Sequence, residues 1–285
     1  MNNTENYLFK TNAIRFAKSD KPFWYTSGKI GPYFINTHFI YGSEESAVKF
    51  LSFIDLCLKQ KNTLPKKLFD EVYSNYLNNS IYMSVIDEMK EKIISDIGID
   101  NFDYISGGER RDWFFSIILA HLLNKPHISI FKDLSTVVSD SNFEIIDTPN
   151  LKDKRVLHIA DLITVASSYK RYWLPAIENL GAKITNSMVV VDRMQGGEEL
   201  LNTLKIKSHS MTKVDPSLFN IAYKQGLIDN SMLNFLNNFF KKPDETMKNF
   251  LINTPKFLED ALASDEKTVS RARLLIDNDL YNLKK

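Results

Sequence analysis

Short apolar segments alternate with longer amphipathic ones through the middle of the chain. Four segments rich in β-branched and aromatic residues have the pattern of buried strands: 104–105, 127–131, 156–159 and 184–191. Helical spacing is found between them at 112–122 and 168–180, with Asp112 as the expected N-cap of the first helix. The polar connection 132–154 is expected to form a hairpin around 140–142. Strands that alternate with helices predict a mainly parallel sheet in an α/β domain.

The remaining segments have a helical pattern. Residues 61–100 place apolar side chains such as Ile81, Val85 and Met89 on one face of a helix. A dense apolar stripe follows at 231–240, and further helices are expected to begin near 243, 254 and 264. We therefore expect a sheet-containing domain over residues 1–205, with helices flanking the sheet and a helical insertion at about 61–100. A helical C-terminal subdomain is expected over 206–285.

Composition excludes several classes of protein. The chain has 285 residues, and its single cysteine, Cys57, excludes an internal disulfide or a thiolate metal cluster. The formal net charge of +1 gives no basis for non-specific nucleic-acid binding. No apolar run approaches the roughly 20 residues that span a bilayer, and residues 1–6 lack the pattern of a signal peptide. The histidines show no metal-ligand spacing. We expect a cytoplasmic protein without nucleic-acid or membrane partners and without a metal site of its own.

Three loops follow strands, at the edge of the sheet where α/β proteins bind ligands. The loop 161–168 places small hydroxyl residues before a helix, where backbone N–H groups attract anions, although Ser and Thr are also ordinary helix caps. The loop 107–112 has two glycines, which permit unusual backbone angles and close ligand approach. Its Arg110 and Arg111 could clamp a phosphate, or could be surface residues of a turn. In the loop 192–198, Arg193 could bind a carboxylate, or form a structural ion pair with a neighbouring acid.

Three segments together resemble the type I phosphoribosyltransferases, and in particular the orotate phosphoribosyltransferase branch. Residues 156–168 (Val-Leu-His-Ile-Ala-Asp-Leu-Ile-Thr-Val-Ala-Ser-Ser) resemble the family's motif for phosphoribosyl pyrophosphate (PRPP), an apolar strand, two acids, two apolar residues and a Thr/Gly/Ser loop. Residues 26–36 (Thr-Ser-Gly-Lys-Ile-Gly-Pro-Tyr-Phe-Ile-Asn) resemble the N-terminal segment of the orotate branch. Residues 191–197 (Val-Asp-Arg-Met-Gln-Gly-Gly) resemble its Leu-Asp-Arg-x-x-x-Gly element. The resemblance covers about 14–60 and 103–200.

The resemblance implies an enzyme of pyrimidine nucleotide synthesis that transfers phosphoribose from PRPP to orotate or a related base and releases pyrophosphate. It further implies Mg²⁺ as a cofactor and a homodimer as the assembly. On matching positions it implies three groups of site residues: Asp161 and Lys132 in catalysis; Arg110, Arg111, Asp161, Thr164, Ser167 and Ser168 in PRPP binding; and Arg193, Phe34 and Lys29 in base binding.

The chain departs from the family pattern at several of these positions. Ala160 stands where the PRPP motif has its first acid, and Thr26 stands where the orotate branch has a lysine. Residues 165–166 are Val-Ala where the loop has a small residue and glycine, and alanine is costly wherever φ is positive. The segment 132–143 keeps only Lys132 of the basic residues and histidine of the family's mobile loop.

These departures leave two alternatives to orotate turnover. One is a catalytically silent protein with the phosphoribosyltransferase fold, which binds PRPP or a nucleotide as a sensor or assembly partner. The other is a related enzyme with a different acceptor.

Overall fold

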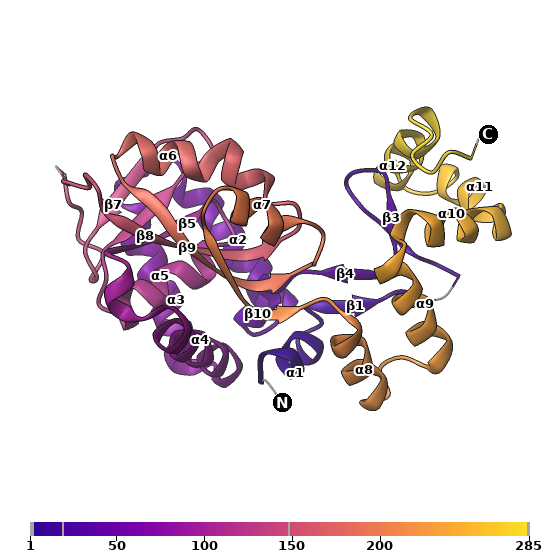
Figure 1. Ribbon diagram of the computed structural model, residues 1–285, viewed down its shortest axis with the longest axis horizontal. Helices are drawn as coiled ribbons and strands as arrows, with labels where there is room; N and C mark the ends of the chain where they lie inside the picture. Colours follow the sequence, from indigo (N-terminus) through magenta and orange to yellow (C-terminus); the bar gives the residue numbers. More distant parts are fainter. Residues whose placement is uncertain (1–2, 19, 148, 284–285) are drawn as a thin grey trace. The chain divides into compact units, whose positions relative to one another are not determined.

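The computed structural model describes residues 3–18, 20–147 and 149–283. The chain divides into two compact units, each made of segments that are distant in sequence (Figure 1). The first, which we call the sheet unit, comprises Met1–Ala13 and Thr37–Lys213. The second, which we call the helical unit, comprises Ile14–Asn36 and Val214–Lys285.

The sheet unit is built on a six-stranded sheet with the order β10-β9-β8-β5-β6-β7. All neighbours pair in parallel except β6 and β7, which are antiparallel. The strands are β5 (Tyr104–Gly108), β6 (His127–Ile130), β7 (Thr136–Ser139), β8 (Arg155–Ile163), β9 (Lys183–Asp192) and β10 (Lys207–Lys213). The mainly parallel α/β sheet predicted from the sequence is therefore confirmed.

The strands nevertheless differ from the prediction at two places. Strand β8 continues to Ile163, so that Asp161 lies within the strand and not in the loop that follows it. Strand β10 lies in a segment for which the sequence predicts helices. Its sequence, Lys-Ser-His-Ser-Met-Thr-Lys, is polar because it forms an edge of the sheet, where the strand is covered less than those in the centre.

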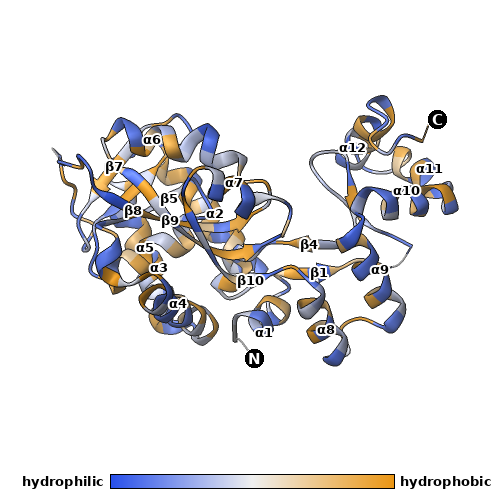
Figure 2. Cartoon of the chain, viewed as in Figure 1, coloured by the Kyte–Doolittle hydropathy of each residue, from blue (hydrophilic) through white to orange (hydrophobic). Residues whose placement is uncertain are grey.

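Helices cover the sheet and extend the unit. They are α1 (Asn3–Lys10), η1 (Thr37–Tyr41), α2 (Glu44–Cys57), α3 (Leu64–Asn78), α4 (Ser80–Lys92), η2 (Ile93–Ile97), η3 (Ile99–Asn101), α5 (Trp113–Leu122), η4 (Tyr169–Trp173), α6 (Leu174–Asn179) and α7 (Gly197–Thr203). The segment expected to form a helical insertion contains α3, α4 and η2. Residues 113–120 of α5 are buried on every side, because this helix packs against the sheet and also against α3 and α4. The outer helices, such as α4, alternate hydrophilic and hydrophobic residues (Figure 2).

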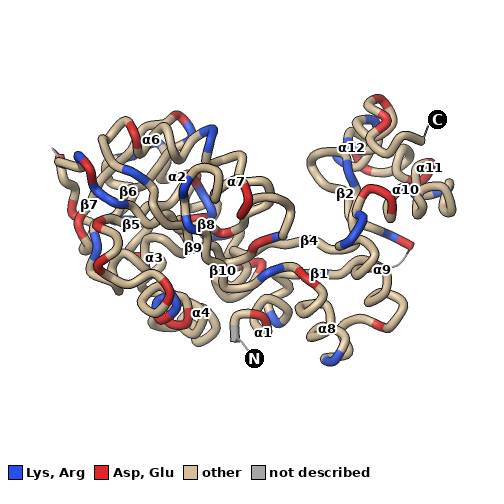
Figure 3. Tube along the Cα trace, viewed as in Figure 1, with Lys and Arg blue, Asp and Glu red and all other residues tan. Residues whose placement is uncertain are grey.

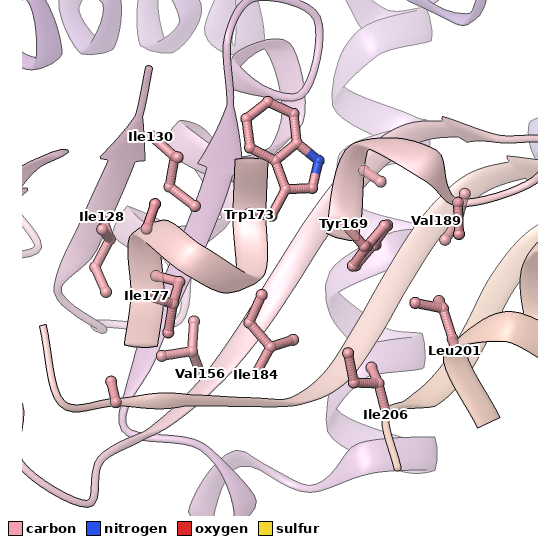
Figure 4. Close-up of a cluster of buried hydrophobic side chains, with 14 of the residues drawn as sticks. Ile128, Ile130, Val156, Tyr169, Trp173, Ile177, Ile184, Val189, Leu201 and Ile206 are labelled. Carbon is pink, nitrogen blue, oxygen red and sulfur yellow. The ribbon is translucent and has the colours of Figure 1, made fainter. Parts of the chain in front are cut away.

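An apolar core lies between the sheet and the helices that follow β8 and β9. Trp173 of η4 and Ile177 of α6 lie against Ile128, Ile130 and Val156 of the sheet (Figure 4). These side chains are almost fully buried, and burying each apolar side chain stabilises the fold by about 1.5–3 kcal/mol. The core thereby fixes η4 beside the carboxyl ends of the strands.

The helical unit joins an N-terminal segment to the C-terminal helices. It contains β1 (Ile14–Phe16) paired with β4 (Tyr33–Ile35), β2 (Phe23–Trp24) paired with β3 (Ile30–Gly31), and the helices α8 (Pro216–Lys224), α9 (Asn230–Lys241), α10 (Pro243–Asn253), α11 (Lys256–Leu262) and α12 (Glu266–Asp277). Trp24 stacks on Phe257, and Arg271 donates a hydrogen bond to the Trp24 carbonyl. Residues 14–36, which the sequence pattern assigns to the sheet-containing domain, therefore pack with the tail. The observed division also falls after Lys213 and not at 205, because β10 belongs to the sheet.

Candidate active site

A pocket of about 330 Å³ opens at the carboxyl ends of the central strands. It is lined by residues 109–112 after β5, by Lys132 after β6, by residues 160–168 at the end of β8 and beyond it, and by Tyr169 and Trp173 of η4. The carboxyl ends of parallel strands meet at one edge of a sheet, which is why these distant segments converge. The pocket brings together these residues of the predicted site: Arg110, Arg111, Lys132, Asp161, Thr164, Ser167 and Ser168.

The two glycines before the arginines belong to strand β5 and have no positive φ angle. The expectation that they adopt unusual backbone angles for a ligand is wrong. A Cβ atom on Gly108 would lie 2.2 Å from the indole of Trp173, and one on Gly107 would lie 2.1 Å from Oγ of Ser116. The glycines are required because protein side chains approach the strand closely.

Asp112 connects two strands at the floor of the pocket. Its sequence context predicts that its side chain caps helix α5, but this is not observed. Its side chain makes no capping hydrogen bond. Instead its Oδ2 accepts a hydrogen bond from the backbone N–H of Gly108 (3.0 Å) and its Oδ1 accepts one from the backbone N–H of Asp161 (2.9 Å). Asp112 thus joins the end of β5 to the end of β8. No local pattern signals this role, because the contact with Asp161, 49 positions later in the sequence, depends on the pairing of β5 with β8.

Asp161 is a partly buried carboxyl group in the pocket wall. Thr37 of η1, which the sequence does not single out, donates a hydrogen bond from Oγ1 to Oδ2 of Asp161 at 2.8 Å. Burial, followed by the nearby carboxylate of Asp112, raises the pKa of Asp161 to about 7, while Arg111 opposes the shift. This acid therefore changes charge near neutral pH.

The basic residues at the pocket differ in the partners they already have. Arg110 is paired with Asp55 of α2. Nζ of Lys132 lies 3.8 Å from Oε1 of Glu109, whose other oxygen accepts a hydrogen bond from the Lys132 backbone. Arg111 is exposed and forms no ion pair within residues 3–18, 20–147 and 149–283. Acidic and basic residues are interspersed along the chain (Figure 3), so the positive charge available to an anion at this site is local.

The turn after β8 presents hydroxyl groups to the pocket. In the described part of the chain, the side chains of Thr164, Ser167 and Ser168 form no hydrogen bond, and Ser168 does not cap the helix that follows. The alternative interpretation is that the hydroxyl residues of this segment are ordinary helix caps. Ser168 does not act as one. Ala166 is buried with a φ of 52°, in the left-handed region that favours glycine.

Replacing Ala166 by glycine is expected to stabilise the protein by about 0.5 kcal/mol. Relief of the left-handed strain contributes about 1–2 kcal/mol, and the greater entropy of glycine in the unfolded chain offsets about 0.4–1 kcal/mol of it. Denaturant unfolding would measure the change. Gly196→Ala is the matched control, because Gly196 has a φ of +93° and a Cβ added there would meet no atom within 4 Å, so this variant should be destabilised by backbone strain alone. A loss of stability in Ala166→Gly would contradict the argument.

The predicted base-binding residues are not gathered at the pocket. Arg193 follows β9 and donates its backbone N–H to the carbonyl of Ile163, but its side chain does not line the pocket. Lys29 and Phe34 belong to the helical unit, where Lys29 forms an ion pair with Asp244 at 2.7 Å. The role of these residues in base binding stays a prediction.

Two structural features are absent from the described residues. No helix in that part of the chain is long and apolar enough to cross a membrane. No group of three or more His, Cys, Asp or Glu side chains within it could hold a metal ion.

Two proteins similar to this chain in sequence are orotate phosphoribosyltransferases. No family model matches the sequence. The chain is 29% identical over 96 residues to an orotate phosphoribosyltransferase of Saccharolobus solfataricus, a match that covers 34% of the chain and 49% of the relative. It is 26% identical over 164 residues to an orotate phosphoribosyltransferase of Rhizobium johnstonii, covering 57% of the chain and 69% of the relative. The match thus spans about half the length of the first relative.

Solved structures agree in fold. The orotate phosphoribosyltransferase of Francisella tularensis superposes with a TM-score of 0.52 at 16% identity, covering 83% of this chain and 96% of that one. The UMP synthase of Leishmania donovani gives a TM-score of 0.55 at 16% identity, covering 84% of this chain and 41% of that one. The resemblance inferred from three motifs is confirmed by these comparisons. The chain has the type I phosphoribosyltransferase fold and is similar in sequence, at less than 30% identity, to two orotate phosphoribosyltransferases.

Proposed function

We propose that the chain transfers phosphoribose from PRPP to orotate or a related base, with release of pyrophosphate. The observation that carries this proposal is the convergence of an arginine, an acid and a hydroxyl-rich turn on one pocket at the carboxyl edge of the sheet. The arginine suits a pyrophosphate, the acid suits ribose hydroxyls, and the hydroxyl-rich turn suits a terminal phosphate.

The proposed binding mode depends on which pocket side chains already have a hydrogen bond or an ion pair within the protein. The hydroxyls of Thr164, Ser167 and Ser168 would donate hydrogen bonds to the 5′-phosphate. Arg111 would bind the pyrophosphate through its planar fork of N–H donors, since Arg110 is already paired with Asp55. Asp161 would accept hydrogen bonds from the ribose hydroxyls.

In the proposed reaction the bond between C1 of the ribose and the pyrophosphate oxygen breaks, a bond from C1 to a ring nitrogen of the base forms, and the proton on that nitrogen is released. Positive charge develops on the sugar while negative charge leaves with the pyrophosphate. Asp161 as a carboxylate would stabilise the sugar, and Arg111 and Lys132 would stabilise the departing pyrophosphate.

Mg²⁺ is held by substrate phosphates with few protein ligands in sites of this kind, where it neutralises phosphate charge. Asp161 of the pocket wall could contribute a carboxylate ligand to a Mg²⁺ ion that arrives with PRPP.

The test is an assay of purified protein with PRPP, Mg²⁺ and a panel of bases that includes orotate. Pyrophosphate release that depends on orotate supports the proposal, and release with another base identifies a different acceptor. Absence of release with every base would reject transferase activity.

A second candidate function is binding without turnover. Strands β6 and β7 form a hairpin, and Lys132 is the one basic residue of the loop that joins them. Lys61 holds this hairpin through Asp133 and through a 2.7 Å hydrogen bond to Ser135. A segment with little positive charge, held in this way, offers limited stabilisation to a leaving pyrophosphate. Calorimetry that detects PRPP binding in a protein without turnover would favour this function, and absence of binding to PRPP, nucleotides and pyrophosphate would reject both candidates.

A further inference from the structure

A chain of buried polar side chains lies beneath the pocket and ends at Asp112. His158 of β8 is fully buried, and its Nδ1 lies 2.9 Å from Oγ of Ser106 on the neighbouring strand β5. Its Nε2 lies 3.5 Å from Oδ2 of Asp112, an electrostatic contact that is longer than an ordinary hydrogen bond. The order of groups from the core to the pocket is therefore Ser106, His158, Asp112.

The neighbours of the imidazole determine which nitrogen carries the proton. A lone pair on Nε2 facing the Asp112 carboxylate would be repelled, whereas an N–H group there is attracted. We therefore assign the proton to Nε2, so that Nδ1 accepts a hydrogen bond from the Ser106 hydroxyl. Although serine, histidine and aspartate also form hydrolytic triads, Ser106 is fully buried and cannot meet a substrate. The three side chains therefore have a structural role: Ser106 orients His158, and His158 faces Asp112.

Aromatic side chains of the pocket wall hold His158 in one orientation. The ring of Trp173 is stacked on it with centroids 5.7 Å apart, and the ring of Tyr169 meets it edge to face at 5.0 Å. Both aromatic residues line the pocket. The imidazole thus contacts the wall of the pocket through these rings and its floor through Asp112.

We propose that His158 is a positioning residue for the transfer reaction, acting through Asp112 on Asp161 and Gly108. The proposal rests on the proposed function. Asp112 accepts the backbone N–H groups that fix the two strand ends, and one of these ends carries the acid while the other precedes the arginine loop. A buried carboxylate that loses a favourable neighbour is driven to move toward water. A displacement of about 1 Å at a reacting group costs up to about 100-fold in rate.

The experiment compares two replacements at His158 with one at a second buried histidine. His158→Phe keeps an aromatic ring between Trp173 and Tyr169 but removes both nitrogens, and His158→Gln retains a donor near Asp112. His127→Phe is the matched control, because His127 is equally buried and hydrogen-bonded to Ser116 and Ser129 but does not contact Asp112. We expect kcat to fall about 10- to 100-fold in His158→Phe with less than about a threefold change in the KM for PRPP. His158→Gln should recover part of the loss, and His127→Phe should keep kcat within about twofold of the wild type, since of the two histidines only His158 contacts Asp112.

A second readout does not depend on activity. Amide hydrogen exchange at Gly108 and Asp161 should accelerate in His158→Phe and remain slow in His127→Phe, since only the first variant disturbs the acceptor of these N–H groups. Unchanged exchange at both amides, or equal acceleration in His127→Phe, would overturn the positioning role. A wild-type protein without transfer activity would reject the proposed function alone, while the exchange measurement would still decide the inference.

Discussion

Replacing Arg111 by methionine is expected to weaken the binding of PRPP and of pyrophosphate by about 10- to 100-fold. Arg111 is exposed at the pocket and has no ion pair in the described part of the chain, whereas Arg110 is paired with Asp55 and Lys132 lies near Glu109. A hydrogen bond to a charged group contributes about 1.5–3 kcal/mol, and each 1.4 kcal/mol corresponds to about a factor of ten in affinity. Titration calorimetry with each ligand would measure the loss.

Two further variants separate the contact from the charge. Arg111→Lys keeps the charge without the planar fork and should recover part of the affinity. Arg273→Met removes the same charge from an exposed position of α12 that does not line the pocket, and its affinity should stay within about twofold of the wild type. Wild-type affinity in Arg111→Met, or an equal loss in Arg273→Met, would show that Arg111 does not bind the ligand.

The arrangement of the pocket could be anticipated because it follows from a general rule for parallel sheets. Three loops are expected at one edge of the sheet, and two of them, 107–112 and 161–168, do line one pocket there, whereas Arg193 of the third loop does not. Strand periodicity also predicts the order of strands and helices through the middle of the chain. Both inferences need only local pattern and the carboxyl-end rule, and no knowledge of which strands are neighbours.

Features that depend on contacts distant in sequence could not be anticipated. Thr37 reaches Asp161 across 124 positions, and its own surroundings in the sequence contain no signal of that contact. Asp112 has the sequence context of a helix cap, but the pairing of β5 with β8 brings a second N–H group to its carboxylate. Residues 14–36 resemble part of a catalytic domain yet pack with helices more than 200 residues later, as the contact of Trp24 with Arg271 shows.

The reason for the two glycines at the end of β5 was also hidden from local pattern. Gly107 and Gly108 precede two arginines, which favours a ligand-facing interpretation, whereas the space beside them is filled by Ser116 and Trp173. A glycine next to a large buried side chain and a glycine next to a ligand have the same sequence signature. Only the position of the indole distinguishes the two.

Replacing Asp161 by asparagine is expected to stabilise the protein while lowering the rate of transfer by about 100- to 1,000-fold. Burial and Asp112 raise the pKa of Asp161 to about 7, so the folded protein holds this proton at pH values where the unfolded chain, with a pKa of about 3.9, has released it. Stability therefore falls as the pH rises from about 4 to about 7. Asparagine does not ionise and can still accept the hydrogen bond from Thr37, so the variant should lack this fall.

The stability difference and the loss of activity have a common origin in the ionised carboxylate of Asp161. At pH 8 the variant should be more stable by on the order of 1–3 kcal/mol, and near pH 4 the two proteins should be similar. Wild-type activity should rise with pH through about 7, because the carboxylate form is the one that stabilises positive charge on the sugar. Thermal unfolding of both proteins from about pH 4 to 8, together with the pH profile of transfer, measures both effects. A variant that is less stable than the wild type at pH 8, or one that retains full activity, would contradict a strained, charged Asp161 at the centre of the site.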